Sequence, residues 1–444
     1  MKRYSIYLVT LLLLFFSSCE KEPVDLTFDA QPEERISERM NELRSLLLEA
    51  EHGWKGNLVT GLGSYGFYLN FEDETNCVML SDLTSETSTE PSTSTYRIIW
   101  AMNAALSFDT FNYITMLQEP SSNFGGQAPN GYISDVDFDY EKNSGDTLYL
   151  RGKKYQLPFT LTKVTAEDKE RYLSSGYPEA IETTQAFFTN NPNAYVNIDS
   201  AGTTYKVGIS IDKELRVFSA SYVDQENKTK SAFSFFTFTL DGIDVITPPG
   251  TAVLGTVFLR AEWDGDQFNL IDTEGQQYEI RNNERPIIPL NKAIGTQYAS
   301  FYSPYLTYFP GTSPAGREIL ARFHDGLESG ATGFRFNSGN IRINWDATNQ
   351  RMSVLGFSSQ NGGASGWTTT IVYDYEFDEN TEIFRFTKRS GPTGGYTGAI
   401  LDQLDDFLLN SGVQLDYHTV DATTYGLMKG VERPEVEITF QLLN

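Results

Sequence analysis

Two hydrophobic periods alternate along this chain, and together they predict a mostly β protein with a few helices. From Pro32 to Gly53, apolar residues recur every three or four positions, which is the spacing of one buried helix face. Proline at the start and glycine at the end are typical helix boundaries. The predicted apolar stripe consists of Ile36, Met40, Leu43, Leu47 and Trp54.

After this helix the period changes to two, which is the spacing of a strand with one buried face. Phe67, Leu69 and Phe71 occupy alternate positions. A polar stretch at 72–76 then leads into the apolar residues 77–80. This arrangement predicts a β-hairpin.

Similar strand-like runs recur to the end of the chain, with further helical patterns between them. The Ser-, Thr- and Glu-rich residues 83–95 predict an exposed loop. Helical spacing returns at 177–188, 319–327 and 400–408. Strands are predicted at 96–102, 111–117, 132–140, 147–155, 205–211, 215–222, 233–240, 257–263, 267–271, 341–345, 352–357, 369–377, 383–386 and 436–442.

The run 132–155 predicts a hairpin together with its register. When the apolar residues are kept on one face, Asp137 lies opposite Arg151 and Asp135 lies opposite Lys153. The aspartates of this run are also a possible calcium loop. Such a loop requires a glycine at its sixth position and a glutamate at its twelfth, and neither is present. We therefore expect a structural role and no metal site.

These patterns predict an α+β fold that is mostly β, with antiparallel sheets or meanders and a few flanking helices. We expect an N-terminal helix plus β-meander domain at 32–170, a β-rich middle region at 171–288 and a C-terminal α+β domain at 289–444. The segment 285–290 contains two prolines and marks the second boundary.

The first residues predict export and lipid attachment. A basic start and an apolar run at 6–16 are typical of a signal peptide, here 1–18, and the run is too short to span a membrane. The sequence from Phe16 to Cys19 resembles the lipobox of bacterial lipoproteins, in which the cysteine carries the acyl chains. The alternative is an ordinary cleaved signal peptide. We expect an anchor at Cys19, a tether at 19–31 and a stable attachment to the outer membrane.

Net charge and cysteine content restrict the expected partners and the way in which the fold is stabilised. The formal net charge is −25, and an acidic surface repels phosphate backbones, so nucleic acid is not an expected partner. Cys77 is the only cysteine besides Cys19 and lies in an apolar stretch. We expect a buried, inert thiol and a fold that depends on its core, without an internal disulfide.

We recognise no catalytic motif in the sequence. The pattern beginning at Gly61 matches a dinucleotide-binding loop but precedes a strand instead of a helix, so we interpret it as a turn. His52, His324 and His418 show no zinc-binding spacing, and the nucleophile-elbow pattern is absent. We predict no catalytic residue, metal or cofactor. A spatially assembled triad or carboxylate pair stays open.

Trp367 is the candidate ligand-binding residue. It follows the Gly- and Ser-rich run 358–366, which predicts an exposed loop, and an exposed indole can stack on a sugar ring. The alternative is an ordinary packing role.

Three segments resemble a family of uncharacterised Bacteroidetes lipoproteins classed as a domain of unknown function. They are Leu106–Tyr113, Ser144–Tyr155 and Phe238–Ile243. The resemblance implies an outer-membrane or surface lipoprotein encoded near uptake components of the starch-utilisation type, and it carries no catalytic residues. The acidic stretch 20–23 also resembles a surface-export signal of such lipoproteins, although it is equally compatible with a plain tether.

These observations lead to a functional hypothesis. We expect a surface-exposed, non-enzymatic accessory lipoprotein that binds a glycan, a peptide or outer-membrane uptake proteins. A structural or adhesive surface protein is the first alternative, and a hydrolase that depends on two carboxylates is the second.

Overall fold

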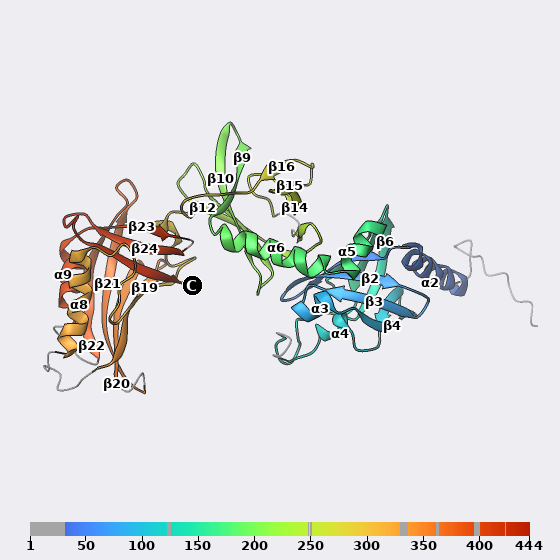
Figure 1. The fold of residues 1–444 in the computed structure, drawn as a ribbon, viewed down its shortest axis with the longest axis horizontal. Helices are drawn as coiled ribbons and strands as arrows, with labels where there is room; N and C mark the ends of the chain where they lie inside the picture. The colour runs from blue at the N-terminus through green and yellow to red at the C-terminus, as the bar shows by residue number, and fades with distance from the viewer. Residues whose placement is uncertain are drawn as a thin grey trace, which may run out of the picture. The chain divides into compact units, whose positions relative to one another are not determined.

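The computed structural model describes residues 32–121, 126–246, 248, 251–328, 336–360, 364–394, 400–421 and 423–444. Cys19, the predicted signal peptide and the predicted tether lie outside these residues. The described chain is mostly β, with antiparallel sheets and few helices, which confirms the predicted fold class (Figure 1). None of its described helices has the length and apolar character needed to cross a membrane.

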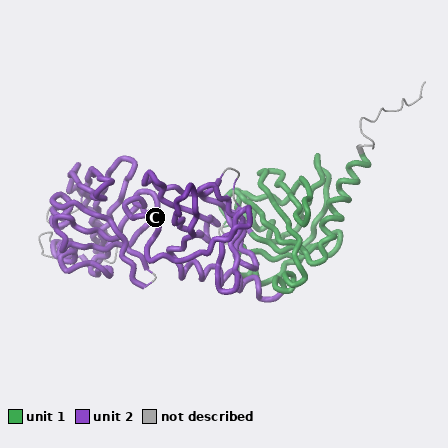
Figure 2. Tube along the Cα trace, turned by 90° about the horizontal axis from the view of Figure 1, so that it is seen from above, with its two compact units in different colours: residues 1–61, 66–173 green, residues 62–65, 174–444 purple. Residues whose placement is uncertain are grey.

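The chain divides into two compact units (Figure 2). Unit 1 contains residues 1–61 and 66–173, and unit 2 contains residues 62–65 and 174–444. The three-part division predicted from the sequence stays a prediction.

Unit 1 is built on an eight-stranded closed antiparallel barrel in which neighbouring strands follow the chain order. The strands are β1 Trp54–Thr60, β2 Gly63–Phe71, β3 Asn76–Ser81, β4 Ser92–Trp100, β5 Ala104–Phe108, β6 Asp137–Ser144, β7 Thr147–Gly152 and β8 Pro158–Lys163. The helices are α2 Pro32–Glu49, α3 Ser85–Thr89, α4 Tyr113–Met116 and α5 Ala166–Leu173. Large apolar side chains of alternate strand positions fill a barrel of this size.

Helix α2 confirms the first periodic prediction except at its end. The helix stops at Glu49, and Trp54 instead begins strand β1. Gly53, with φ +89°, reverses the chain between the two elements. The Trp54 indole still faces the helix, because its Nε1 donates a 3.1 Å hydrogen bond to the Leu47 carbonyl. Trp54 therefore packs against α2 although it belongs to the following strand. The helical spacing alone could not show this difference.

The predicted hairpin at 132–155 is present as β6 and β7, but its predicted register is wrong. Asp139 lies opposite Arg151, and the register shifts between Tyr140 and Lys142. The extra residue of this β-bulge changes which side chains face each other. Lys153 consequently pairs with Asp139 at 2.6 Å.

Arg151 and Asp135 also have partners that differ from the predicted ones. Arg151 pairs with Glu141. The Asp135 carboxylate accepts hydrogen bonds from the backbone N–H groups of Lys154 and Tyr155, at 2.8 and 3.0 Å. These contacts favour a structural role for Asp135, with backbone amides in place of Lys153.

Two local predictions are wrong because side-chain capping decides the backbone. The expected strand 111–117 contains helix α4, whose N-terminus is capped by the Asn112 side chain accepting from the backbone N–H groups of Ile114 and Thr115. The expected loop 83–95 contains helix α3, capped by Thr84, and the first residues of β4.

In the main part of unit 2, residues 174–444, helix α6, Gly176–Asn190, comes first and packs on a nine-stranded antiparallel sheet. Phe187 of the helix meets Phe268 of the sheet with ring centroids 5.0 Å apart. The spatial order is β16-β15-β14-β13-β12-β11-β10-β9-β17. The strands are β9 Ala194–Ser200, β10 Thr203–Asp212, β11 Val217–Val223, β12 Thr229–Phe238, β13 Gly242–Ile246, β14 Phe258–Asp264, β15 Gln267–Asp272, β16 Gln277–Glu279 and β17 Arg281–Asn282.

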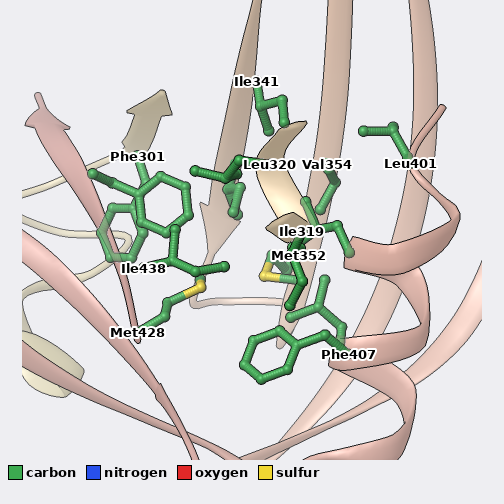
Figure 3. Packing of buried hydrophobic residues seen from close by; sticks show 14 of the residues in the cluster. Phe301, Ile319, Leu320, Ile341, Met352, Val354, Leu401, Phe407, Met428 and Ile438 are labelled. Atoms are coloured by element: carbon green, nitrogen blue, oxygen red, sulfur yellow. The ribbon is translucent and has the colours of Figure 1, made fainter. Parts of the chain in front are cut away.

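A second closed eight-stranded barrel completes unit 2. Its elements are α7 Leu290–Ala293, β18 Ser300–Pro304, α8 Pro314–Glu328, β19 Ser338–Asp346, β20 Arg351–Gln360, β21 Ser365–Asp378, β22 Ile383–Gly394, α9 Asp402–Asn410, β23 Val413–Val420, β24 Thr423–Gly430 and β25 Glu437–Leu443. Figure 3 shows Ile319 and Leu320 of α8 among strand residues such as Met352 and Ile438. The predicted helices 319–327 and 400–408 are confirmed and contribute to this core.

The second barrel has one weakly paired seam. Strands β22 and β23 share a single register pair, Phe384 with Val413. Glu432 spans the seam with its carboxylate, which accepts from the Gly412 backbone N–H at 2.6 Å and from the Arg385 guanidinium at 2.7 Å. The hydrogen bond from Arg385, followed by that from Gly412, lowers the pKa of Glu432 from 4.5 to about 2.

Replacing Glu432 with Gln should lower the melting temperature of the protein at neutral pH, because a neutral amide loses the ion pair with Arg385. A folded-state pKa below the unfolded one adds stability above about pH 4.5 and loses it as the pH falls towards about 2. The difference in melting temperature between wild type and Glu432→Gln should therefore shrink across this window, measured by scanning calorimetry. Glu435→Gln, in the same connection, is the control, and a pH-independent difference for Glu432→Gln would contradict the assignment.

Candidate functional site

The candidate site is a cleft of about 490 Å³ within unit 2, between the nine-stranded sheet and the segment that leads into the second barrel. Its floor is one face of three neighbouring strands, β10, β11 and β12. Its wall is formed mainly by residues 286–288, by helix α7 and by residues 296–298.

The floor is polar because strand alternation sends the large apolar residues to the opposite face. Val207 and Phe218 belong to the sheet core. Gly208, Ser219 and Ser221, which line the cleft, occupy alternate positions on the other face. The small floor side chains leave room above the sheet and present hydroxyl groups to it. The hydroxyl-bearing residues of the floor are Ser210, Ser219, Ser221, Thr229 and Ser231.

The floor strands present their side-chain face to the cleft, while their backbone pairing differs along the strands. Strand β12 pairs with β11 over 229–235 and with β13 only over 235–238. A ligand lying on this face meets the floor side chains first. The hydroxyls of Ser221 and Ser231 lie 2.9 Å apart, which shows how closely the polar groups of adjacent strands are set.

The wall is held on the second barrel by a buried hydrogen bond and an ion pair. The Tyr417 hydroxyl of β23 donates to the Ile288 carbonyl at 2.9 Å, and burial raises the pKa of this tyrosine. Arg285 pairs with Asp416 at 3.0 Å. Wall and floor also meet closely, since a Cβ added to Gly208 would lie 3.3 Å from the Ile287 Cβ.

The cleft combines hydroxyls, the two side-chain amides of Asn193 and Gln297, one ammonium group and an exposed aromatic ring. Phe233 projects from the floor with 59 % of its surface exposed. Lys292, Gln297 and Tyr298 come from the wall. Burial raises the pKa of Tyr298 above its ordinary value. Among the described lining residues there is no Asp, Glu or His, so this cleft offers no carboxylate pair for general acid–base chemistry.

Two further hollows adjoin the cleft along the segment 282–287. One of about 640 Å³ shares Pro192 and Asn193 with the cleft and is rich in asparagine. Another of about 440 Å³ shares Pro286 and Ile287 with it. The concave surface is therefore longer than the cleft alone.

Trp367, the residue predicted to bind ligand, lies elsewhere. The loop expected before it is wrong in part, because strand β21 begins at Ser365 and carries Trp367. Its half-buried ring packs against the core of the second barrel and meets Phe336 edge-on, with centroids 5.6 Å apart. This packing favours the structural alternative, and a ligand role stays a prediction. Cys19 lies outside the described residues.

The remaining predicted residues occupy structural positions. Gly61 lies in the turn before β2, as expected, and the buried thiol of Cys77 has a raised pKa because burial disfavours the thiolate. The three histidines are separate: His52 follows α2, His324 lies on α8 beside Asp325, and His418 lies on β23. Within the described ranges, no cluster of three His, Cys, Asp or Glu residues could hold a metal ion.

The sequence did contain a weak signal for the cleft floor. The strand predictions rest on the apolar face alone, for example on Val207 and Ile209. The other face reads Gly208 and Ser210 on one strand and Ser219 and Ser221 on the next. Recurrent small hydroxyl residues on the second face of consecutive strands would have indicated a polar floor, but not the wall above it.

Comparison with known proteins assigns the chain to a family. Residues 25–260 match the family model described as a domain of unknown function, DUF4302. The chain belongs to this family. The DUF4302 match includes the cleft floor and ends before the wall and the second barrel. A search of curated proteins finds no match to this DUF4302 member.

Some crystal structures align with the chain at very low similarity. The C. crescentus beta sliding clamp is 10 % identical, with 92 % of this chain and 96 % of that chain covered and a TM-score of 0.15. The DNA polymerase III subunit beta sliding clamp of Bartonella birtlesii is 9 % identical, with coverages of 93 % and 97 % and a TM-score of 0.14. The beta subunit of Streptococcus pyogenes DNA polymerase is 9 % identical, with coverages of 91 % and 98 % and a TM-score of 0.12. TM-scores this low carry no conclusion about fold or function.

Replacing Tyr417 with Phe should loosen the wall of the cleft. The change leaves the buried Ile288 carbonyl without its donor, which costs about 1–3 kcal/mol. Thermal unfolding should show a lower melting temperature, and amide exchange in the segment 286–298 should accelerate. Tyr425→Phe, on the paired strand β24, is the control. Unchanged exchange in Tyr417→Phe would show that the wall is held by other contacts.

Proposed function

We propose that this DUF4302 member is a non-enzymatic binding lipoprotein of a nutrient-uptake system, anchored through Cys19 at the outer cell surface, and that it holds a neutral glycan in the cleft of unit 2. The observation that carries the glycan proposal is the cleft itself, with its hydroxyl-bearing floor, its exposed Phe233 and its lining without carboxylates. The anchor and the surface location rest on the lipobox-like residues 16–19 and on the family resemblance.

Sugar chemistry fits this lining better than peptide chemistry. A sugar ring presents hydroxyls at its edge and an apolar face of C–H groups. The floor serines, Gln297 and Lys292 supply donors and acceptors for the edge, and Phe233 supplies a ring for the face. An extended peptide would instead bind through backbone hydrogen bonds to an open strand edge. The cleft lies instead over the side-chain face of β10, β11 and β12, where serine hydroxyls and the Phe233 ring line it.

The lining also favours binding over hydrolysis. Glycoside hydrolysis generally needs two carboxyl groups on either side of the scissile bond. The cleft has only Lys292 and Tyr298 as ionisable lining residues in the described chain. A bound glycan would therefore be held without being cleaved, as an accessory protein of an uptake complex requires.

Replacing Phe233 with Ala should weaken glycan binding without affecting the fold. Loss of a stacked ring costs about 0.5–1.5 kcal/mol, which corresponds to an increase in Kd of about 2–10-fold. Titration calorimetry with neutral oligosaccharides would measure this change. Leu215→Ala is the matched control, because Leu215 is 62 % exposed in the turn between β10 and β11 and does not line the cleft. Equal affinity of Phe233→Ala and wild type, or turnover of the glycan, would contradict the proposal.

The anchor can be tested independently of the ligand. Cys19→Ala should move the protein from the membrane fraction to the soluble fraction, because the acylated residue is lost. Protease added to intact cells should degrade the wild-type body if it faces outward. Protection until the outer membrane is broken would place the body in the periplasm and contradict the surface location.

A further inference from the structure

The turn between β4 and β5 of unit 1 exposes two large apolar side chains. Met102 is 97 % exposed and Trp100 is 41 % exposed. Met102 adopts φ +71°, a left-handed conformation that is unfavourable for a side chain of this kind. A soluble turn would ordinarily place glycine or asparagine there. We propose that this turn rests on a lipid surface, beside the membrane anchor of the proposed function.

The turn is fixed from within, so its apolar side chains stay directed outward. The Ala101 N–H donates to the Asn103 carbonyl at 3.1 Å. The Lys153 ammonium group donates to the Ala101 carbonyl at 2.8 Å and pairs with Asp139. These contacts fix the turn, while nearly all of Met102 and 41 % of Trp100 remain accessible to an external apolar contact.

The turn lies next to the helix through which the chain enters unit 1. The Tyr140 carbonyl accepts from the Asn103 side-chain amide at 2.7 Å and from the Arg39 guanidinium at 3.4 Å. Arg39 is seven residues after the start of α2 at Pro32, which is about 10 Å along a helix. The apolar turn and the first turns of α2 therefore lie on the same end of unit 1.

Chain length permits contact with the membrane that would hold Cys19. The twelve residues 20–31 between the cysteine and α2 can span at most about 40 Å when fully extended. A body on so short a connection stays close to the bilayer, and the end of unit 1 that carries Trp100 is the end that the connection enters. This is the argument for a lipid surface as the occupant instead of a protein.

The residue types match the membrane interface. Tryptophan prefers the headgroup region because its indole has an apolar body and an N–H donor. Methionine adapts its shape to an irregular apolar surface. Because the chain carries a net charge of −25, anionic headgroups would repel it, so the surface we propose is a zwitterionic one.

The test uses the full acylated protein reconstituted into phosphatidylcholine vesicles. Lipids brominated near the headgroup should quench part of its tryptophan fluorescence, and lipids brominated deep in the bilayer should quench less. Trp100→Phe should lose this quenching while still floating with the vesicles. Phe111→Ser is the matched control, because Phe111 is 62 % exposed and follows the opposite end of β5. This variant should retain the quenching.

The outcomes separate this proposal from the anchor on which it rests. If the wild-type protein floats with the vesicles but is quenched no more than Trp100→Phe, the lipid contact is overturned and the anchor is left intact. Failure of the wild-type protein to float would overturn both. Quenching that requires anionic lipid would contradict the zwitterionic surface.

Discussion

Closure of the two eight-stranded sheets into barrels is the constraint on which much of this structure depends. A strand edge with unpaired backbone groups is an open template for aggregation, and barrels remove it. Both eight-stranded sheets are closed barrels. In the nine-stranded sheet, the consecutive strands β16 and β17 occupy opposite ends of the strand order with only Ile280 between them, so the two ends meet there. Ile280 is itself buried in the sheet core. In the described chain the fold is thus held by apolar strand faces, among which the free thiol of Cys77 is buried.

Closure also explains why the site lies where it does. Buried apolar side chains occupy the interior of the second barrel, and a barrel of eight strands is just wide enough to be filled in this way. The concave surface arises instead where the nine-stranded sheet meets the segment leading into the second barrel. Tyr417 and Asp416 hold that segment from the barrel side, while Gly208 provides the space for Ile287 on the sheet side. The cleft is thus a consequence of how two sheets of unit 2 are joined, with neither sheet sufficient alone.

Much of the secondary structure could be predicted because it follows from local periodicity. The helices at 177–188 and 319–327, and most strands of unit 2, are recognisable from their buried faces alone. The misassignments have specific physical causes. Asn112 caps a short helix within an apolar run that we predicted to be a strand. The bulge after Tyr140 accompanies a register that differs from the one predicted from matching faces, so Arg151 lies opposite Asp139 and not Asp137. The cleft could not be predicted because its floor and its wall are far apart in the sequence. Trp367 resembled a binding residue only because it stands beside a Gly- and Ser-rich stretch.

The two-faced construction of strands β10, β11 and β12 has an evolutionary consequence. One face supplies the core, and the other supplies the hydroxyls of the cleft floor. Because the floor side chains do not contribute to core packing, they can change with little loss of stability. Gly208 is the exception, since Ile287 lies against it. Related chains could therefore diverge in what they recognise while conserving their fold, so that ligand preference varies among relatives more readily than architecture does.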